Sequence, residues 1–444
     1  MNRPIVAAAL ILTACGSAAA GTSPNTQSPT SVEPATTAVA TVGEQLALPT
    51  LAVTSADNTI TVVRAGVVDG VYSDARLAAD GHTLVHSVTE PNGETTVEWI
   101  DLSTGTAAGS ATITAGRNGR LELAALDEQG DSAVVVSAAS AVVGDDIAGA
   151  RSSTEIVIVS KPADSTSTGK VLYRTTVPGN VVPEMLSPSN SGTPATVFAL
   201  EYLPADHPAV YRVRVLDTLT GTLAIPADLR EKVQAADESM AGISRAKVMV
   251  PTRKLLLTLY RGRNPDGTLY SFIHALRYDG IPDGPWPGSY CLDLPDSLQL
   301  QESAASVAVS PDQRMLFFAN GNGILGSFRV VDLDDHDRSP AVHSTGQLKD
   351  TGQLKDTATH APAITATDSA LWVAYDTTVI ELDPTDLGQR QRFMLADDVL
   401  AMVPTDNGLI AVGPTAVTMF DAHGVVHGRW PIAVTDPRHV IVVP

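Results

Sequence analysis

The feature of this sequence that most constrains its fold is a recurring unit of short apolar strands separated by turns. Runs of about four to eight Val, Ile, Leu and Thr residues alternate with Gly, Asp, Asn and Pro turns. Residues 367–383 and 405–421 align without a gap, and each reads as turn, strand, tight turn, strand and aspartate. Such a unit cannot cover both of its apolar faces alone, so the repetition predicts copies that pack on one another.

Five longer or weaker copies lie upstream, which makes seven units in all. They span Asp80–Gly105, Asp131–Ser160, Ser187–Gly221, Thr252–Asp279 and Ser310–Asp332. The phrases ADGHTLVHS with VEWIDLSTG, and SPDQRMLFF with FRVVDLD, resemble the repeats of TolB-like and WD-repeat-like β-propellers. This resemblance implies an all-β fold, a β-propeller. The seven copies predict seven blades, with six or eight as the alternatives.

The two ends of the repeat region indicate how such a ring would close. The strand-like segment Leu51–Val63 precedes the first unit, and Val440–Val443 follows the last. We therefore expect the N-terminal strand to pair with the last blade. Helix signals are scarce, and one helix is predicted over Pro226–Ser239, where Pro226 precedes good helix formers and Leu229 with Val233 forms an i, i+4 apolar pair.

The N-terminus carries an export signal. Arg3 precedes an apolar run from Ile5 to Leu12, which is shorter than the roughly 20 residues that span a bilayer. The segment Leu12-Thr13-Ala14-Cys15-Gly16 resembles the bacterial lipobox. That resemblance implies that residues 1–14 are a lipoprotein signal peptide and that Cys15 is the lipid attachment site. The expected location is the bacterial cell envelope, on the outer face of the cytoplasmic membrane.

The segment after the lipobox differs in composition from the rest. From Gly16 to about Gly43 it consists mainly of Ala, Thr, Ser, Pro and Gly, which bury too little apolar surface to fold. We predict a disordered tether over residues 15–45 and a propeller domain over residues 46–444.

Composition excludes some classes of partner. The chain has 29 Lys and Arg against 49 Asp and Glu, a net charge of −20, which would repel nucleic acid. The two cysteines are Cys15 and Cys291, so lipid on Cys15 leaves no partner for an internal disulfide. Cys291 is interpreted as a buried small hydrophobe.

Catalytic motifs are mostly absent. The sequence has no G-x-S-x-G, H-E-x-x-H or G-x-x-x-x-G-K-[ST] motif. Ser244 and Lys247 fit S-x-x-K, but that chemistry needs a helical turn, and the following Val248-Met249-Val250 is typical of a strand. We predict no catalytic residue and no cofactor.

Other conspicuous side chains have structural interpretations. The acidic stretch Asp332–Asp337 and the pair Asp145–Asp146 could offer oxygen ligands to Ca²⁺, but they lack the EF-hand pattern and are interpreted as solvated loops, so no metal site is predicted. His82 and His86 are expected to pack or to face solvent. Blade packing is expected of the four tryptophans, Trp99, Trp286, Trp372 and Trp430.

The duplicated TGQLKD, residues 345–350 and 351–356, is interpreted as a loop that tolerates insertion.

Two functions from different classes fit these observations. The first is a monomeric, non-catalytic binding or scaffolding lipoprotein with an envelope protein as its partner. The second is an extracytoplasmic propeller enzyme, a lactonase-like hydrolase or a quinoprotein, with its site in the central channel. Three or more carboxylate, Asn or His side chains in the channel would favour the enzyme, and an apolar lining would favour the scaffold. A solute-binding lipoprotein is disfavoured, because those proteins usually have two α/β lobes.

Overall fold

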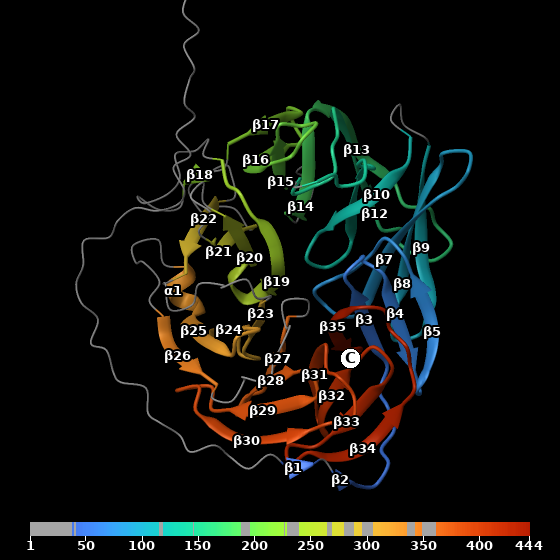
Figure 1. Cartoon of the computed structure of the whole chain (residues 1–444). Coiled ribbons are helices and arrows are strands. Elements are labelled where there is room, and N and C mark those ends of the chain that lie inside the picture. The colour runs from blue at the N-terminus through green and yellow to red at the C-terminus, as the bar shows by residue number, and fades with distance from the viewer. Residues whose placement is uncertain are drawn as a thin grey trace, which may run out of the picture.

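The computed structural model describes residues 38–39, 41–114, 119–144, 146–187, 196–225, 227–228, 239–263, 269–278, 288–294, 305–334, 342–348 and 361–444. These residues form eight sheets, each built on four antiparallel strands, and the sheets are arranged in a ring as the blades of a β-propeller (Figure 1). The all-β propeller predicted from the repeats is confirmed. The predicted count of seven blades is wrong.

The blades follow one another along the chain, each running from its innermost to its outermost strand. Blade 1 holds β35 (Pro437–Val442), β3 (Leu51–Ser55), β4 (Ile60–Arg64) and β5 (Val67–Tyr72). Blade 2 holds β6 (Ala75–Leu77), β7 (Thr83–Thr89), β8 (Thr95–Asp101) and β9 (Thr106–Ile113). Blade 3 holds β10 (Leu121–Leu126), β11 (Ser132–Ser137), β12 (Ser153–Ser160) and β13 (Val171–Pro178). Blade 4 holds β14 (Asn180–Leu186), β15 (Thr196–Leu203), β16 (Val210–Asp217) and β17 (Thr222–Ala224).

The second half of the ring repeats this order. Blade 5 holds β19 (Ile243–Val250), β20 (Leu255–Arg263), β21 (Leu269–Arg277) and β22 (Gly288–Asp293), with a 3₁₀ turn at Pro251–Arg253. Blade 6 holds β23 (Ala305–Val309), β24 (Met315–Asn320), β25 (Ile324–Arg329) and β26 (Val342–Gln347), with the short helix α1 (Val330–Asp334) between the last two. Blade 7 holds β27 (Ala363–Ala366), β28 (Leu371–Tyr375), β29 (Thr378–Leu382) and β30 (Gln389–Met394). Blade 8 holds β31 (Ala401–Thr405), β32 (Gly408–Val412), β33 (Val417–Phe420) and β34 (Val425–Trp430).

The eighth blade is built from both ends of the chain. The seven repeats of the sequence are blades 2–8, whereas blade 1 takes three strands from the N-terminal region and its innermost strand, β35, from the C-terminus. Leu51 pairs with Val442 and Val53 with Val440, and three of these side chains, Leu51, Val53 and Val440, are fully or almost fully buried. The N-terminal strand therefore pairs with the C-terminal segment, as expected, but the blade that this pairing completes is the first one and not the last.

Three short strands extend the outer edges of other blades. β1 (Ala38–Val39) pairs in parallel with β30, β2 (Thr41–Val42) with β34, and β18 (Ala227–Asp228) with β22. β1 and β2 lie before residue 46, where the propeller domain was predicted to begin. β18 contradicts the helix predicted over Pro226–Ser239 at Ala227 and Asp228, and residues 229–238 lie outside the described residues.

Aspartates fix the turns that made the repeats visible in the sequence. Asp101 accepts hydrogen bonds from the amide and the hydroxyl of Ser103, and Gly105 adopts φ +72° at the end of the same turn. Asp217 and Gly221, also at φ +72°, form the equivalent turn of blade 4. The hydrogen bonds lower the pKa of Asp101, and the one from the Ser103 hydroxyl has the largest effect. The ionised carboxylate of Asp101 therefore stabilises the turn.

The core consists of apolar layers between neighbouring blades. Trp99 of β8 is fully buried and donates a hydrogen bond from its indole Nε1 to the Gly130 carbonyl of blade 3, at 2.6 Å. Trp372 is 2% exposed, Trp430 is half-buried, and Trp286 lies outside the described residues. The packing role predicted for Trp99 and Trp372 is confirmed.

No helix in the described part of the chain is long and apolar enough to span a bilayer.

Candidate functional site

A cavity of about 710 Å³ lies among the innermost strands of blades 2–5, with one wall from the 57–59 turn of blade 1. Five carboxylates line it: Asp57, Asp74, Glu122, Asp127 and Glu184. Four cationic side chains line it with them: Arg76, Arg120, Arg151 and Lys247. Its volume lies within the range of about 300–1,000 Å³ that is usual for small-molecule sites.

The inner strands place these charges regularly. Charged residues lie inside the innermost strands of four consecutive blades: Arg76 in β6, Glu122 in β10, Glu184 in β14, and Arg245 and Lys247 in β19. The strands β23, β27 and β31, which take the same place in blades 6–8, carry no charged residue. The innermost strands of blades 2–5 therefore carry charged residues, whereas those of blades 6–8 carry none.

Two of the carboxylates are neutralised by cations. The buried Arg151 donates from Nη2 to Glu122 at 2.5 Å, from Nη1 to the Asn180 side chain at 3.1 Å and from Nε to the Ser137 carbonyl at 2.7 Å. Burial lowers the pKa of Arg151, while the neighbouring Glu122 opposes that shift. Lys247 forms an ion pair with Glu184. These pairs connect blade 3 with itself and blade 4 with blade 5.

The other three carboxylates are held by hydrogen bonds. Asp74, at φ +49°, accepts from the Ser87 hydroxyl and from the Leu123 amide at 2.8 Å, which joins blade 2 to blade 3. Asp57 accepts from the Thr59 amide at 3.0 Å. Asp127 accepts from the Asp131 amide at 2.8 Å, and burial raises its pKa to about 6.

Two arginines of the cavity contrast with these paired groups. Arg76 is half-buried and donates from Nη1 to the Ala75 carbonyl at 3.0 Å, and Arg120 is exposed. Neither guanidinium has a carboxylate within ion-pair distance among the described residues. Burial lowers the pKa of Arg76, although Asp74, Glu184 and Glu122 all act to raise it.

A second hollow, of about 220 Å³, lies between blades 6 and 7 and includes Ser310, Asp312, His343 and Asp368. The Ser310 hydroxyl donates to Asp312 at 2.6 Å and accepts from the Met315 amide at 2.9 Å. Ser310 and Asp312 therefore belong to the turn before β24.

The histidines noted in the sequence take separate structural places. His86 is 8% exposed, lies 3.0 Å from a Glu98 oxygen through Nε2, and its ring meets that of Tyr72 edge-on at 5.1 Å. His82 is exposed. The expectation that they pack or face solvent is confirmed.

The S-x-x-K motif lies in strand β19, as predicted, and Lys247 is used in the ion pair with Glu184.

In β22 the backbone of Cys291 pairs directly opposite that of His274, a neighbour that the sequence did not predict. His274 is 1% exposed, and burial lowers its pKa to about 3, so its imidazole is neutral.

The predicted acidic loops contribute no cluster to the described structure. Asp332 lies in α1, contrary to the predicted solvated exit turn, and is 7% exposed with its carboxylate 2.8 Å from Arg329 Nε. Residues 335–340 and Asp145 lie outside the described residues, as do Cys15 and the rest of 1–37. Among the residues that are described, no group of three His, Cys, Asp or Glu side chains could hold a metal ion.

The first TGQLKD copy corrects the loop interpretation. Thr345–Gln347 belong to β26, where Thr345 pairs with Gly326 and Gln347 with Ile324, and Leu348 is buried. The polar residues lie on an outer strand, whose two faces need not both be apolar. The second copy lies outside the described residues.

Comparisons with known proteins give similarity at low identity. No protein-family model matches the sequence, and no curated protein matches it. Sqt1 of Saccharomyces cerevisiae is 9% identical, with a TM-score of 0.44, over 90% of this chain and 97% of that chain. BamB of Moraxella catarrhalis is 11% identical, with a TM-score of 0.37, over 88% and 95%. The dihydro-heme d1 dehydrogenase NirN is 13% identical, with a TM-score of 0.43, over 94% and 78%. At these values the comparisons assign no function to this chain.

Proposed function

We propose that this chain is a lipid-anchored, extracytoplasmic propeller that binds a protein partner of the cell envelope without catalysing a reaction. The observation that carries the proposal is the outer strand of blade 1. In β5, Val67, Val68 and Val71 are 64%, 46% and 61% exposed, and among the described strands β5 pairs with β4 alone. An apolar strand with an open edge is a template for a strand from another chain.

The rest of the ring supports strand addition as the mode of binding. β18, β1 and β2 already extend blades 5, 7 and 8 through parallel pairing, for example Thr41 with Val425. After β2, which covers the edge of blade 8, the chain runs to β3 of blade 1 (Figure 1), and no strand in the described part of the chain covers the outer edge of β5. The partner we infer is an extended segment with apolar side chains on both of its faces, because the adjacent Val67 and Val68 place valines on both faces of β5.

A cross-linking experiment tests this docking site. A photo-reactive residue at position 67 in intact cells should capture one envelope protein through an extended segment. The double variant Val68→Lys, Val71→Lys should abolish the capture, because charge on an edge strand opposes pairing. The matched control Leu219→Lys changes a residue that is 74% exposed in blade 4 and should leave it intact. Capture that survives the double variant, or that the control loses equally, contradicts the proposal.

The anchor is tested separately. Labelling with a palmitate analogue should mark the protein, and Cys15→Ala should remove the label and shift the protein out of the detergent phase. The physical reason is that two acyl chains give stable membrane attachment where one is marginal. Equal detergent partitioning of variant and wild type would overturn the lipoprotein assignment.

An enzyme remains the second candidate, and two observations favour it. The cavity holds five carboxylates, more than the three set above as the mark of an enzyme, and the pKa of Asp127, near 6, suits a general acid. Against it, Glu122 and Glu184 are paired with cations, and no His or Cys lines the cavity among the residues that the structure describes. Turnover of a lactone or an ester by the purified protein, abolished in Asp127→Asn, would decide for the enzyme.

A further inference from the structure

Two cationic side chains in the cavity of blades 2–5, Arg76 and Arg120, have N–H groups that can bind a ligand. Arg76 uses one of its N–H groups on the Ala75 carbonyl, and a guanidinium has five. Arg120 makes no side-chain hydrogen bond or ion pair with the described residues. A planar guanidinium with free N–H groups matches the two oxygens of a carboxylate.

The cavity's own acids do not fill this role. Glu122 is paired with Arg151 and Glu184 with Lys247, and no described carboxylate, Asp74 included, lies within ion-pair distance of Arg76 or Arg120. Burial outweighs the attraction of these acids in setting the pKa of Arg76, so its cation is poorly solvated. A poorly solvated cation gains more from an incoming anion than an exposed one does.

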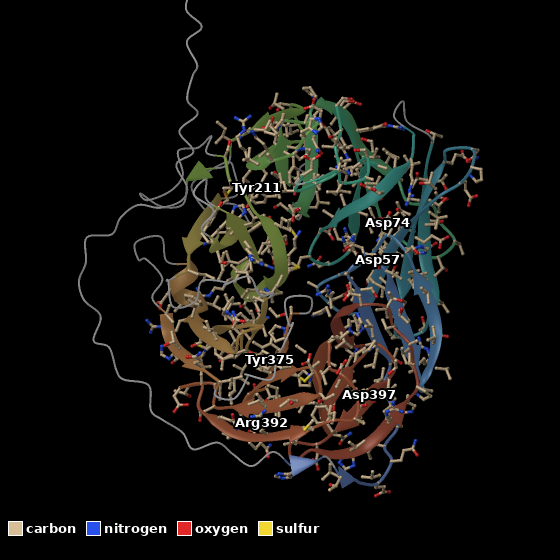
Figure 2. The ribbon with its side chains drawn as sticks, in the orientation of Figure 1. Asp57, Asp74, Tyr211, Tyr375, Arg392 and Asp397 are labelled. Carbon is tan, nitrogen blue, oxygen red and sulfur yellow. The ribbon has the colours of Figure 1, made fainter. Side chains whose placement is uncertain are left out.

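Carboxylate oxygens without a partner lie beside the same strand. Asp57 Oδ2 and Asp74 Oδ1 accept no hydrogen bond from the described residues, whereas Asp57 Oδ1 and Asp74 Oδ2 are used. The Ala75 amide donates to the Asn58 carbonyl at 3.0 Å, which holds the Asp57 turn next to β6. Figure 2 shows Asp57 and Asp74 near each other. A cationic ligand group can therefore bind close to where an anionic group binds.

Apolar side chains complete the walls. Leu77, Met185, Met249 and Leu256 line the cavity, and its 710 Å³ exceeds the needs of one amino acid. We propose that the cavity binds a zwitterionic small molecule with an apolar body, such as a short apolar peptide. Its carboxylate pairs with Arg76 and Arg120, and its ammonium group faces Asp57 and Asp74. This site is independent of the partner surface on β5.

Calorimetric titration of the full chain with leucyl-leucine tests the proposal. The free dipeptide should bind at least about tenfold more tightly than acetyl-leucyl-leucine, which lacks the ammonium group, or leucyl-leucine amide, which lacks the carboxylate. Arg76→Gln should weaken the free dipeptide about tenfold and leave the amide unchanged. Asp57→Asn should weaken the free dipeptide and leave the acetylated form unchanged, because Asn keeps an oxygen for the Thr59 amide.

Two further variants keep the test decisive. If Arg76→Gln fails to fold, Arg120→Gln tests the same ligand carboxylate at an exposed position. It too should weaken the free dipeptide and leave the amide unchanged. Arg314→Gln, whose side chain is 84% exposed on blade 6, is the matched control and should bind as wild type. Equal affinity for the free and capped dipeptides, no binding of any of them, or wild-type affinity in both arginine variants of the cavity overturns the proposal.

Discussion

Shortening a single valine in the C-terminal strand should reveal whether that strand completes the propeller. Val440 of β35 is 2% exposed and packs with residues of blades 1 and 8. Val440→Ala removes two buried methyl groups, each worth about 0.8 kcal/mol. The cavity left behind raises the expected loss of unfolding free energy to about 2–3 kcal/mol. For a protein of this size the melting temperature should fall by about 2–3 °C, because the entropy of unfolding grows with chain length.

The matched control makes the same chemical change on the surface. Val71 of β5 is 61% exposed, so Val71→Ala should change the unfolding free energy by less than about 0.5 kcal/mol. Calorimetric melting of the two variants beside wild type, with denaturant midpoints as a second measure, gives the comparison. If both variants melt alike, β35 contributes no core to blade 1, and the account of an eighth blade closed by the C-terminus is refuted.

Three further predictions test the packing and the cavity. Trp99→Phe should cost about 1–3 kcal/mol by denaturant unfolding, because the buried Gly130 carbonyl loses its donor; an unchanged midpoint would contradict this. Gly424→Ala should lower the melting temperature, because the residue has φ +79° and an added Cβ would lie 2.7 Å from the Phe393 ring; unchanged melting would refute the close packing. Asp127→Asn should be more stable than wild type at pH 7, because the folded pKa of Asp127, about 6, exceeds the ordinary 3.8 and makes its ionised form unfavourable in the folded protein. The difference in unfolding free energy between variant and wild type should disappear as the pH falls through 6 towards 3.8. A difference that does not change with pH would exclude this cause.

The propeller could be predicted from the sequence because each repeat contains turns that require particular residue types. A turn such as Asp101 to Gly105 requires an acceptor at its start and a positive φ at its end, and only a few residue types supply either. All seven visible units proved to be blades. The eighth escaped because its inner strand lies more than 380 residues from its second, and pairing at that distance leaves no local pattern.

The helix prediction failed for a related reason. Good helix formers follow Pro226, yet Ala227 and Asp228 pair with Gly288 and Ser289 at the edge of blade 5. Two backbone pairs on a preformed sheet outweighed weak local propensity there. The loop assigned to TGQLKD failed in the same way, since Thr345–Gln347 pair with β25.

The candidate site shows where sequence reasoning could have gone further. Arg76, Glu122, Glu184 and Lys247 each lie in the innermost strand of a blade, before the residue at which the predicted unit of that blade begins, and a charge there is costly unless it is paired or used. That pattern was visible in the sequence. The sequence could not show which charges form ion pairs. Glu184 pairs with Lys247, 63 residues away, whereas Arg76 has no carboxylate within ion-pair distance among the described residues. Which charges pair depends on the ring, because it places four inner strands around one cavity. Glu184 and Lys247 therefore stabilise the contact between two blades, whereas Arg76 is available to bind a ligand.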